Sequence, residues 1–250
     1  MMTAGIDSGS AATKAVLLKG TDMFFRIVPT GFDFRQAARD AYKAVLAEAR
    51  EQAADHVAVT GYGRHGIEFA TKTVTEITAH ARGVSFMYPG VKGIIDIGGQ
   101  DSKVIVVDSG KVADFQMNDK CAAGTGRFLE HTARALEVDV ADLGRLALAS
   151  NNPANISSMC TVFAESEVIS LRAQGVAKED IAAGLVESIA RRVAAMAKPM
   201  GLKEHVALVG GVAKNEGIRK ALERELGREI YVPPEPQITA ALGAALLANR

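Results

Sequence analysis

Residues 4–18 read AGIDSGSAATKAVLL, and residues 93–107 read GIIDIGGQDSKVIVV. The two stretches align without gaps. An aspartate, a glycine, a hydroxyl-bearing residue and a lysine fall at the same places between two apolar runs. Each stretch predicts a strand, a tight turn and a second strand. The shared frame indicates an internal duplication, and hence two lobes of similar topology. The alternative is two unrelated hairpins.

The remaining sequence alternates apolar runs with helical patterns. This alternation predicts an α/β fold with two lobes of mixed sheet flanked by helices. We expect residues 1–86 to form lobe I, with a C-terminal helix at about 237–250 packing back on it, and residues 87–236 to form lobe II. Helices are predicted over residues 35–54, 74–86, 124–137, 161–173, 216–226 and 237–248, and strands over residues 56–60, 206–209 and 230–232.

Composition excludes several classes of partner. Lys plus Arg equals Asp plus Glu at 29 each, so the formal net charge is zero. This balance does not indicate a nucleic acid or an anionic membrane as the main partner, and we expect neither. No apolar run reaches the ~18 residues of a membrane helix. The chain starts without a signal-peptide pattern, so we expect a cytoplasmic protein without a structural disulfide.

The two duplicated turns suit a nucleotide triphosphate with Mg²⁺. Glycine amides in the turns can approach phosphate oxygens closely, and carboxylates can hold Mg²⁺ through its waters. Positioning and electrostatics of this kind suffice for phosphoryl transfer. The candidates are Gly9, Gly98 and Gly99 for the amides, Asp7 and Asp96 for Mg²⁺, and Ser10, Thr13 and Lys14 for the phosphates. Asp7, Gln100 and Asp101 are the alternatives for activating water.

A third glycine motif follows the strand predicted over residues 206–209. Gly210 and Gly211, continued by Lys214 and Asn215, form a candidate platform for the adenosine. The alternative is an ordinary turn between a strand and a helix. The chain has no Gly-x-x-x-x-Gly-Lys-(Ser/Thr) sequence, which excludes a P-loop ATPase.

Cys121 and Cys160 are the only cysteines of the chain. Two chains together supply four thiolates, the usual number for a [4Fe–4S] cluster. Both cysteines precede predicted helices, whose N-termini stabilise thiolates. Gly124 and Gly126 leave room for an inorganic group and offer amide donors. The alternatives are two small buried hydrophobic residues, or a zinc site shared between two chains.

We assign no functional role to several other charged residues. We expect Arg127, Arg191 and Arg192 to be solvated charges on helices, and His80 to have a structural role.

Together these motifs resemble a known superfamily. Residues 7–14, 96–101 and 209–212 are similar to the two phosphate motifs and the adenosine motif of the acetate kinase/sugar kinase/Hsp70/actin superfamily. Residues 96–103, 117–128 and 160–167 resemble one branch of it. That branch contains the activators (component A) of 2-hydroxyacyl-CoA dehydratases and the ATP-hydrolysing subunits of benzoyl-CoA reductase. The resemblance runs from residue 4 to about residue 247.

The resemblance implies an actin-like, ribonuclease H-like fold with a nucleotide cleft between its lobes. It implies Mg²⁺-dependent ATP hydrolysis, and one [4Fe–4S] cluster per homodimer held by Cys121 and Cys160 of each subunit. It further implies that ferredoxin or flavodoxin supplies one electron. The electron then passes at low potential to a dehydratase or reductase with iron–sulfur centres of its own.

Three other functions are also compatible with the sequence. The first is an ATPase subunit of a benzoyl-CoA reductase-type complex, paired with a sister chain. The second is a small-molecule kinase of the same superfamily, although the short interval between Asp7 and Asp96 leaves little room for a substrate-binding insertion. The third is a chaperone or binding module that uses ATP without redox chemistry, which leaves both cysteine segments unexplained.

Overall fold

A computed structural model describes residues 1–157, 160–202 and 204–249. The chain forms two compact units. The first comprises Met1–Ile94, Ile105–Asp114 and Pro233–Arg250, and the second comprises Ile95–Val104 and Phe115–Val232. Strands β6 (Gly93–Ile97) and β7 (Ser102–Asp108) contribute residues to both units. The lobes expected at 1–86 and 87–236 are therefore simpler than this interleaved division, and they stay a prediction.

The first unit is built on a five-stranded mixed sheet of order β3-β2-β1-β4-β5. Strands β1, β2 and β3 are antiparallel, whereas β4 and β5 run parallel to β1. In the β1–β2 hairpin Asp7 lies opposite Lys14. The bounds are β1 (Met2–Ser8), β2 (Ala12–Lys19), β3 (Asp22–Pro29), β4 (His56–Thr60) and β5 (Lys72–Thr73).

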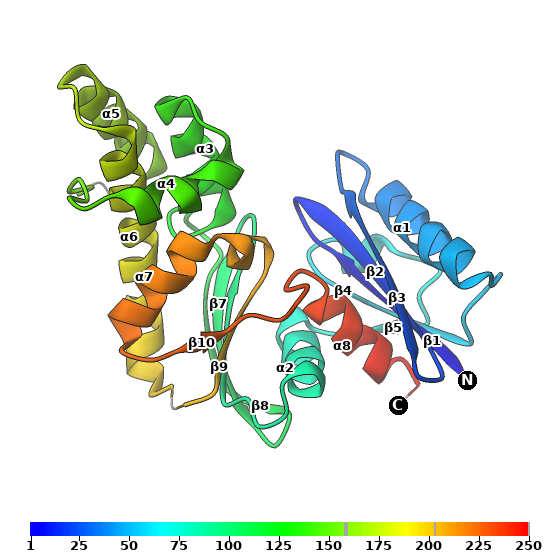
Figure 1. Ribbon diagram of the computed structural model, residues 1–250. Helices are drawn as coiled ribbons and strands as arrows, with labels where there is room; N and C mark the ends of the chain where they lie inside the picture. Colours follow the sequence, from blue (N-terminus) through cyan, green and yellow to red (C-terminus); the bar gives the residue numbers. More distant parts are fainter. Residues whose placement is uncertain (158–159, 203, 250) are drawn as a thin grey trace. The chain divides into compact units, whose positions relative to one another are not determined.

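Helices cover both faces of this sheet (Figure 1). Helix α1 (Phe34–Ala49) packs on one face, where Ile6, Leu17 and Val45 are fully buried. Helix α8 (Thr239–Leu247) packs on the other face, around Val16. Asp33 caps α1, and the helix ends where Arg50 adopts a left-handed conformation, so the predicted extension to residue 54 is wrong.

Helix α8 also packs against α2 (Glu76–Met87) at backbone distance. A Cβ atom on Gly243 would lie 1.8 Å from the carbonyl oxygen of Ala79, and a Cβ on Gly83 would lie 1.9 Å from that of Thr239. Only glycine permits this approach. The small residues predicted as a C-terminal helix therefore fix α8 against α2, within the first unit. Arg250, the last residue of that prediction, lies outside the described residues.

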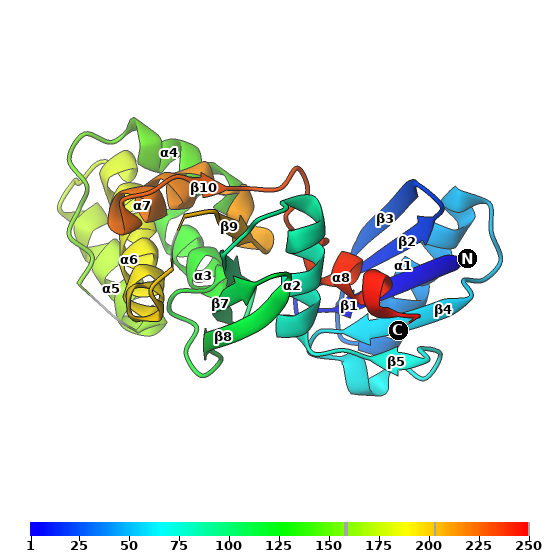
Figure 2. The same cartoon turned by 90° about the horizontal axis from the view of Figure 1, so that it is seen from below.

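The second five-stranded sheet has the order β10-β9-β6-β7-β8. Its further strands are β8 (Lys111–Asn118), β9 (Val206–Val209) and β10 (Ile230–Tyr231). Helix α6 (Lys178–Ala197) is the central helix of the second unit and contacts each of the others (Figure 2). The others are α3 (Gly126–Leu136), α4 (Leu143–Ala149), α5 (Thr161–Ala173) and α7 (Glu216–Leu226). Over the described residues no helix is both long enough and apolar enough to span a bilayer.

Candidate functional site

The turn between β1 and β2 carries a buried carboxylate with one oxygen left over. Lys14 Nζ donates to Asp7 Oδ2 at 2.9 Å. Asp7 Oδ1 is buried and has no hydrogen-bond partner among the described residues, and the same holds for Ser8 Oγ and Thr60 Oγ1. Asp7 and Thr60 are paired in register at the carboxyl ends of the parallel strands β1 and β4. Buried oxygens without partners are costly unless a ligand or water satisfies them.

This donor set fits the predicted nucleotide chemistry. A carboxylate and two hydroxyls are hard oxygen donors, as Mg²⁺ and its waters require. Ser8 and Thr60 were missed from the sequence, because single hydroxyl residues at strand ends are common and only the parallel pairing brings them beside Asp7.

Thr13 has a different place from the one expected. Its side chain is fully buried, and its hydroxyl lies 2.8 Å from the hydroxyl of Thr30, which also donates to the Gly9 carbonyl at 2.7 Å. In this structure the Thr13 hydroxyl therefore helps to fix the turn, and its contact with a phosphate stays a prediction. Ser10 is half-buried at the tip of the same turn.

The second turn repeats the aspartate–lysine pair at greater depth. Asp96 and Lys103 are each 2% exposed. Lys103 Nζ lies 3.2 Å from Asp96 Oδ2 and 2.8 Å from Asp101 Oδ1. The Gly98 amide donates to the Asp101 carbonyl at 2.9 Å, which closes the turn, whereas Gln100 is exposed at its tip. The predicted duplication is therefore visible as the same aspartate–lysine pairing in both hairpins.

The predicted adenosine motif packs directly on this second turn. Gly210 has a φ of +87°, and a Cβ there would lie 2.5 Å from Asp96 Oδ1. Gly211 and Lys214 are exposed in a short 3-10 turn. Asn215 uses its side-chain oxygen to cap α7, accepting from the Ile218 amide at 3.0 Å. The structure thus brings Gly210 to Asp96, and it gives Asn215 a structural duty.

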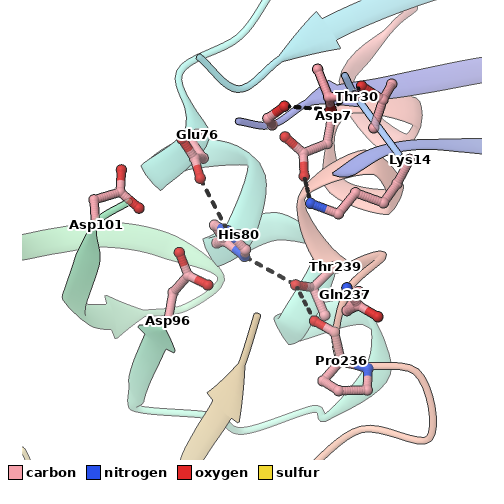
Figure 3. Close-up of polar contacts among 12 residues, drawn as sticks. Asp7, Lys14, Thr30, Glu76, His80, Asp96, Asp101, Pro236, Gln237 and Thr239 are labelled. Atoms are coloured by element: carbon pink, nitrogen blue, oxygen red, sulfur yellow. Dashed lines mark hydrogen bonds and ion pairs between the residues drawn. The ribbon is translucent and has the colours of Figure 1, made fainter. Parts of the chain in front are cut away.

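His80 has the structural role expected of it. It is buried in the first unit, with Nδ1 3.0 Å from Thr239 Oγ1 and Nε2 3.8 Å from Glu76 Oε1 (Figure 3). Because Thr239 is the first residue of α8, this contact links α2 to α8. The Asp7–Lys14 pair of the same unit is also drawn in Figure 3.

Both cysteine thiols are exposed, so the alternative of two small buried hydrophobic residues is wrong. Cys160 is the N-cap of α5, as predicted. Cys121 lies in a turn five residues before α3 begins, where Asn118 Nδ2 donates to its carbonyl oxygen at 2.9 Å. Ser158 and Met159, in the segment before Cys160, lie outside the described residues.

The two glycines after Cys121 do not leave the open space expected of them. A Cβ on Gly124 would lie 2.9 Å from Arg192 Cδ, so the Arg192 side chain already occupies that space. The Gly126 amide donates to the Gly98 carbonyl at 2.8 Å and is not available for a sulfide. Arg192 is half-buried beside the cysteine, so its interpretation as a solvated helix charge is also wrong.

Helix α3 connects the second turn to the cysteine segments. Its first amides, from Gly126 and Arg127, donate to the carbonyl oxygens of Gly98 and Gly99 at 2.8 and 3.0 Å. At its other face His131 Nε2 lies 2.7 Å from Glu165 Oε2 on α5. The candidate phosphate loop is thus hydrogen-bonded to the helix that follows Cys121, and that helix contacts the one that follows Cys160.

Comparison with known proteins agrees with this geometry. Residues 4–248 match the model of the BadF/BadG/BcrA/BcrD ATPase family. The chain is 48% identical to the 2-hydroxyisocaproyl-CoA dehydratase activator of Clostridioides difficile, over 99% of this chain and 95% of that protein. It is 35% identical to one of the subunits of the Thauera aromatica benzoyl-CoA reductase, over 98% and 92% of the two chains.

Two solved structures are also similar throughout. Component A of the Acidaminococcus fermentans (R)-2-hydroxyglutaryl-CoA dehydratase has a TM-score of 0.96 at 47% identity, covering 99% of this chain and 97% of that one. The C. difficile activator with bound ADPNP has a TM-score of 0.94 at 47% identity, covering 99% and 94%. The predicted actin-like α/β fold class is confirmed.

Proposed function

Because the chain belongs to the BadF/BadG/BcrA/BcrD ATPase family, we propose that it is an ATP-dependent activator of a 2-hydroxyacyl-CoA dehydratase, passing it one low-potential electron. The observation that carries this proposal is the set of hydrogen bonds from Gly126 and Arg127 to the Gly98–Gly99 turn. They link the turn that we assign to nucleotide binding directly to a cysteine segment, as coupling of ATP hydrolysis to electron transfer requires.

ATP hydrolysis is assigned to the two turns. Glycine amides at Gly9 and Gly99 would hold the phosphates, and Asp7 and Asp96 would hold Mg²⁺. The Gly98 amide, also expected at the phosphates, instead closes its turn by donating to the Asp101 carbonyl. The unpartnered oxygens of Asp7, Ser8 and Thr60 support this assignment, since a hydrated cation satisfies them. Asp7, Gln100 and Asp101 stay the alternatives for activating water. The nucleotide analogue named in the C. difficile structure supports ATP as the ligand.

Electron transfer is assigned to the cysteines. Cys121 and Cys160 of two chains would hold one [4Fe–4S] cluster, which supplies one-electron redox chemistry when bound. The exposed thiols support this, because ligands shared across a twofold axis must lie at the surface of each chain. Ferredoxin or flavodoxin would supply the electron in the cytoplasm, and the dehydratase would receive it.

Coupling between the two activities follows the hydrogen bonds. When the Gly98–Gly99 turn closes on a γ-phosphate, its carbonyls shift the first turn of α3, and α3 moves the Cys121 turn. The His131–Glu165 contact carries the shift to α5, whose N-cap is Cys160. Hydrolysis relaxes the turn and makes the transfer directional.

The test is purification without oxygen, followed by assay of iron, sulfide and the visible spectrum. We expect a dimer with about two iron atoms per chain and a brown colour that Cys121→Ala abolishes. Thr161→Ala, one residue beyond the other cysteine, is the matched control and should keep its iron. Protein that hydrolyses ATP but contains no iron would refute the redox function.

The 35% identity to a benzoyl-CoA reductase component supports a second candidate, an electron-transfer ATPase subunit of a reductase complex. It differs in assembly, because a permanent complex pairs the chain with a sister protein. Co-purification of a second, related chain in fixed ratio from the native host would favour this candidate. A homodimer would favour the dehydratase activator.

A further inference from the structure

The Arg192 side chain lies beside Cys121 in the folded protein. It lies on α6, 71 residues away in the sequence, and its Nη1 atom lies 3.7 Å from Cys121 Sγ. Its aliphatic stem runs over Gly124, where a Cβ would lie 2.9 Å from Cδ and 3.3 Å from Cγ. Gly124 also has a φ of +87°, which disfavours any other residue. Because Gly124 has no Cβ atom, the Arg192 side chain can pack over it and reach the sulfur.

Arg192 lies on a well-packed part of helix α6. Its neighbours Val193 and Ala194 are buried, and Ile189, one turn earlier on α6, is buried as well. The arginine is half-buried and lines two cavities, of about 490 Å³ and 420 Å³. No carboxylate of the described residues pairs with it, whereas the adjacent Arg191 lies 3.4 Å from Glu187. The Arg192 guanidinium is therefore a positive charge beside the sulfur that no carboxylate of the described residues neutralises.

We propose that Arg192 is a positioning residue of the electron-transfer site, whose guanidinium N–H donates to the Cys121 sulfur and raises the potential at which the site accepts its electron. This inference rests on the proposed function. Hydrogen bonds to cluster sulfurs and nearby positive charge stabilise the reduced, more negative state. Guanidinium combines a permanent charge with several N–H donors, which suits this duty better than an ammonium group.

The test is a redox titration of the iron-loaded dimer, followed by electron paramagnetic resonance. Arg192→Gln removes the charge, and we expect the ratio of reduced to oxidised protein at fixed potential to fall about tenfold, which is a shift of about 59 mV to more negative values. Arg192→Lys keeps the charge and changes the donor, so a smaller shift in the same direction is expected. Arg191→Gln, the matched control on the same helix, should leave the potential unchanged.

The outcomes separate this inference from the proposed function. Wild-type protein without iron would refute the proposed function itself. Iron-loaded Arg192→Gln and Arg192→Lys with the wild-type potential would overturn the role of Arg192 and leave the proposed function standing. If Arg192→Gln does not retain iron, Arg192→Lys decides, because a more negative potential supports the inference and an unchanged one refutes it.

Discussion

Lys103 places its ammonium nitrogen 3.2 Å from Asp96 Oδ2, and both side chains are buried. The same nitrogen lies 2.8 Å from Asp101 Oδ1, so one lysine holds two carboxylates of the second turn. The equivalent pair in the first turn, Lys14 with Asp7, is closer in distance at 2.9 Å but more exposed on the lysine side, at 15%. The duplicated hairpins thus share a pairing and differ in its burial.

This difference predicts unequal effects of removing the two lysines. Lys103→Met leaves two carboxylates without their buried partner, and we expect it to lower the free energy of unfolding by about 3 kcal/mol. Lys14→Met should cost less, because it removes the partner of one carboxylate and not of two, and the Lys14 side chain is the less buried of the two lysines. Urea unfolding monitored by circular dichroism measures both. Equal losses for the two variants would contradict the ranking.

Removal of an unpartnered hydroxyl should separate stability from nucleotide binding. Thr60→Val deletes a buried hydroxyl that has no partner among the described residues, so the protein without nucleotide should be as stable as the wild type or more stable. Its affinity for Mg·ADP should fall roughly tenfold, equivalent to about 1.4 kcal/mol. Calorimetry measures both quantities.

Thr71→Val is the matched control for that experiment. The Thr71 hydroxyl donates to the Val57 carbonyl at 2.9 Å, so its loss should cost about 1 kcal/mol of stability and leave Mg·ADP affinity unchanged. A Thr60→Val variant that binds Mg·ADP normally would show that its hydroxyl does not face the nucleotide.

The contact between the second turn and α3 predicts a variant with impaired coupling. A Cβ on Gly126 would lie 3.2 Å from the Gly98 carbonyl oxygen, so Gly126→Ala pushes the two apart by a few tenths of an ångström. If ATP shifts α3 and the Cys121 turn, it should change how fast a chelator removes iron from the proposed cluster. In Gly126→Ala we expect ATP binding to persist while this effect of ATP becomes several-fold smaller. Gly66→Ala is the control, since its Cβ would meet only the Arg35 side chain. An undiminished ATP effect in Gly126→Ala would argue against this route.

Acid should weaken the attachment of α7. Burial raises the pKa of Glu223. Hydrogen bonds from the Ile230 amide and from Lys220, together with the charge of Arg219, lower it by more than burial raises it, so the pKa lies below the ordinary 4.5. A lowered folded-state pKa gives stability that is fully present above pH 4.5 and is lost as the pH falls through the folded pKa. Glu223→Gln should therefore be about 1 kcal/mol less stable than the wild type at pH 7, and the gap should close in acid. Thermal unfolding against pH tests this, and a constant gap would contradict it.

Local sequence predicted much of this molecule. The helices over residues 161–173 and 216–226 and the strands over residues 56–60 and 206–209 have the predicted bounds, because caps and apolar runs mark them clearly. Strand β3 was not predicted, because the only signal in its sequence is an apolar run. In the structure that run is half exposed, since β3 lies at the edge of the sheet.

Contacts of the candidate site that depend on packing between distant segments could not be predicted from the sequence. Cys121 and Cys160 stand out by residue type, but Arg192 reaches Cys121 only through the packing of α6. Thr60 meets Asp7 only through a parallel strand pairing. Conversely, Thr13 and Asn215 carry suitable side chains for a nucleotide, and the fold uses them for a turn and a helix cap.

The most direct test of the proposed activator is electron transfer under control of the nucleotide. Iron-loaded, reduced dimer would be mixed in a stopped-flow instrument with an oxidised 2-hydroxyacyl-CoA dehydratase, in the presence of Mg·ATP or Mg·ADP. We expect one electron per dimer to pass with Mg·ATP and none with Mg·ADP. Transfer at the same rate with both nucleotides, or none with either, would contradict an ATP-dependent activator.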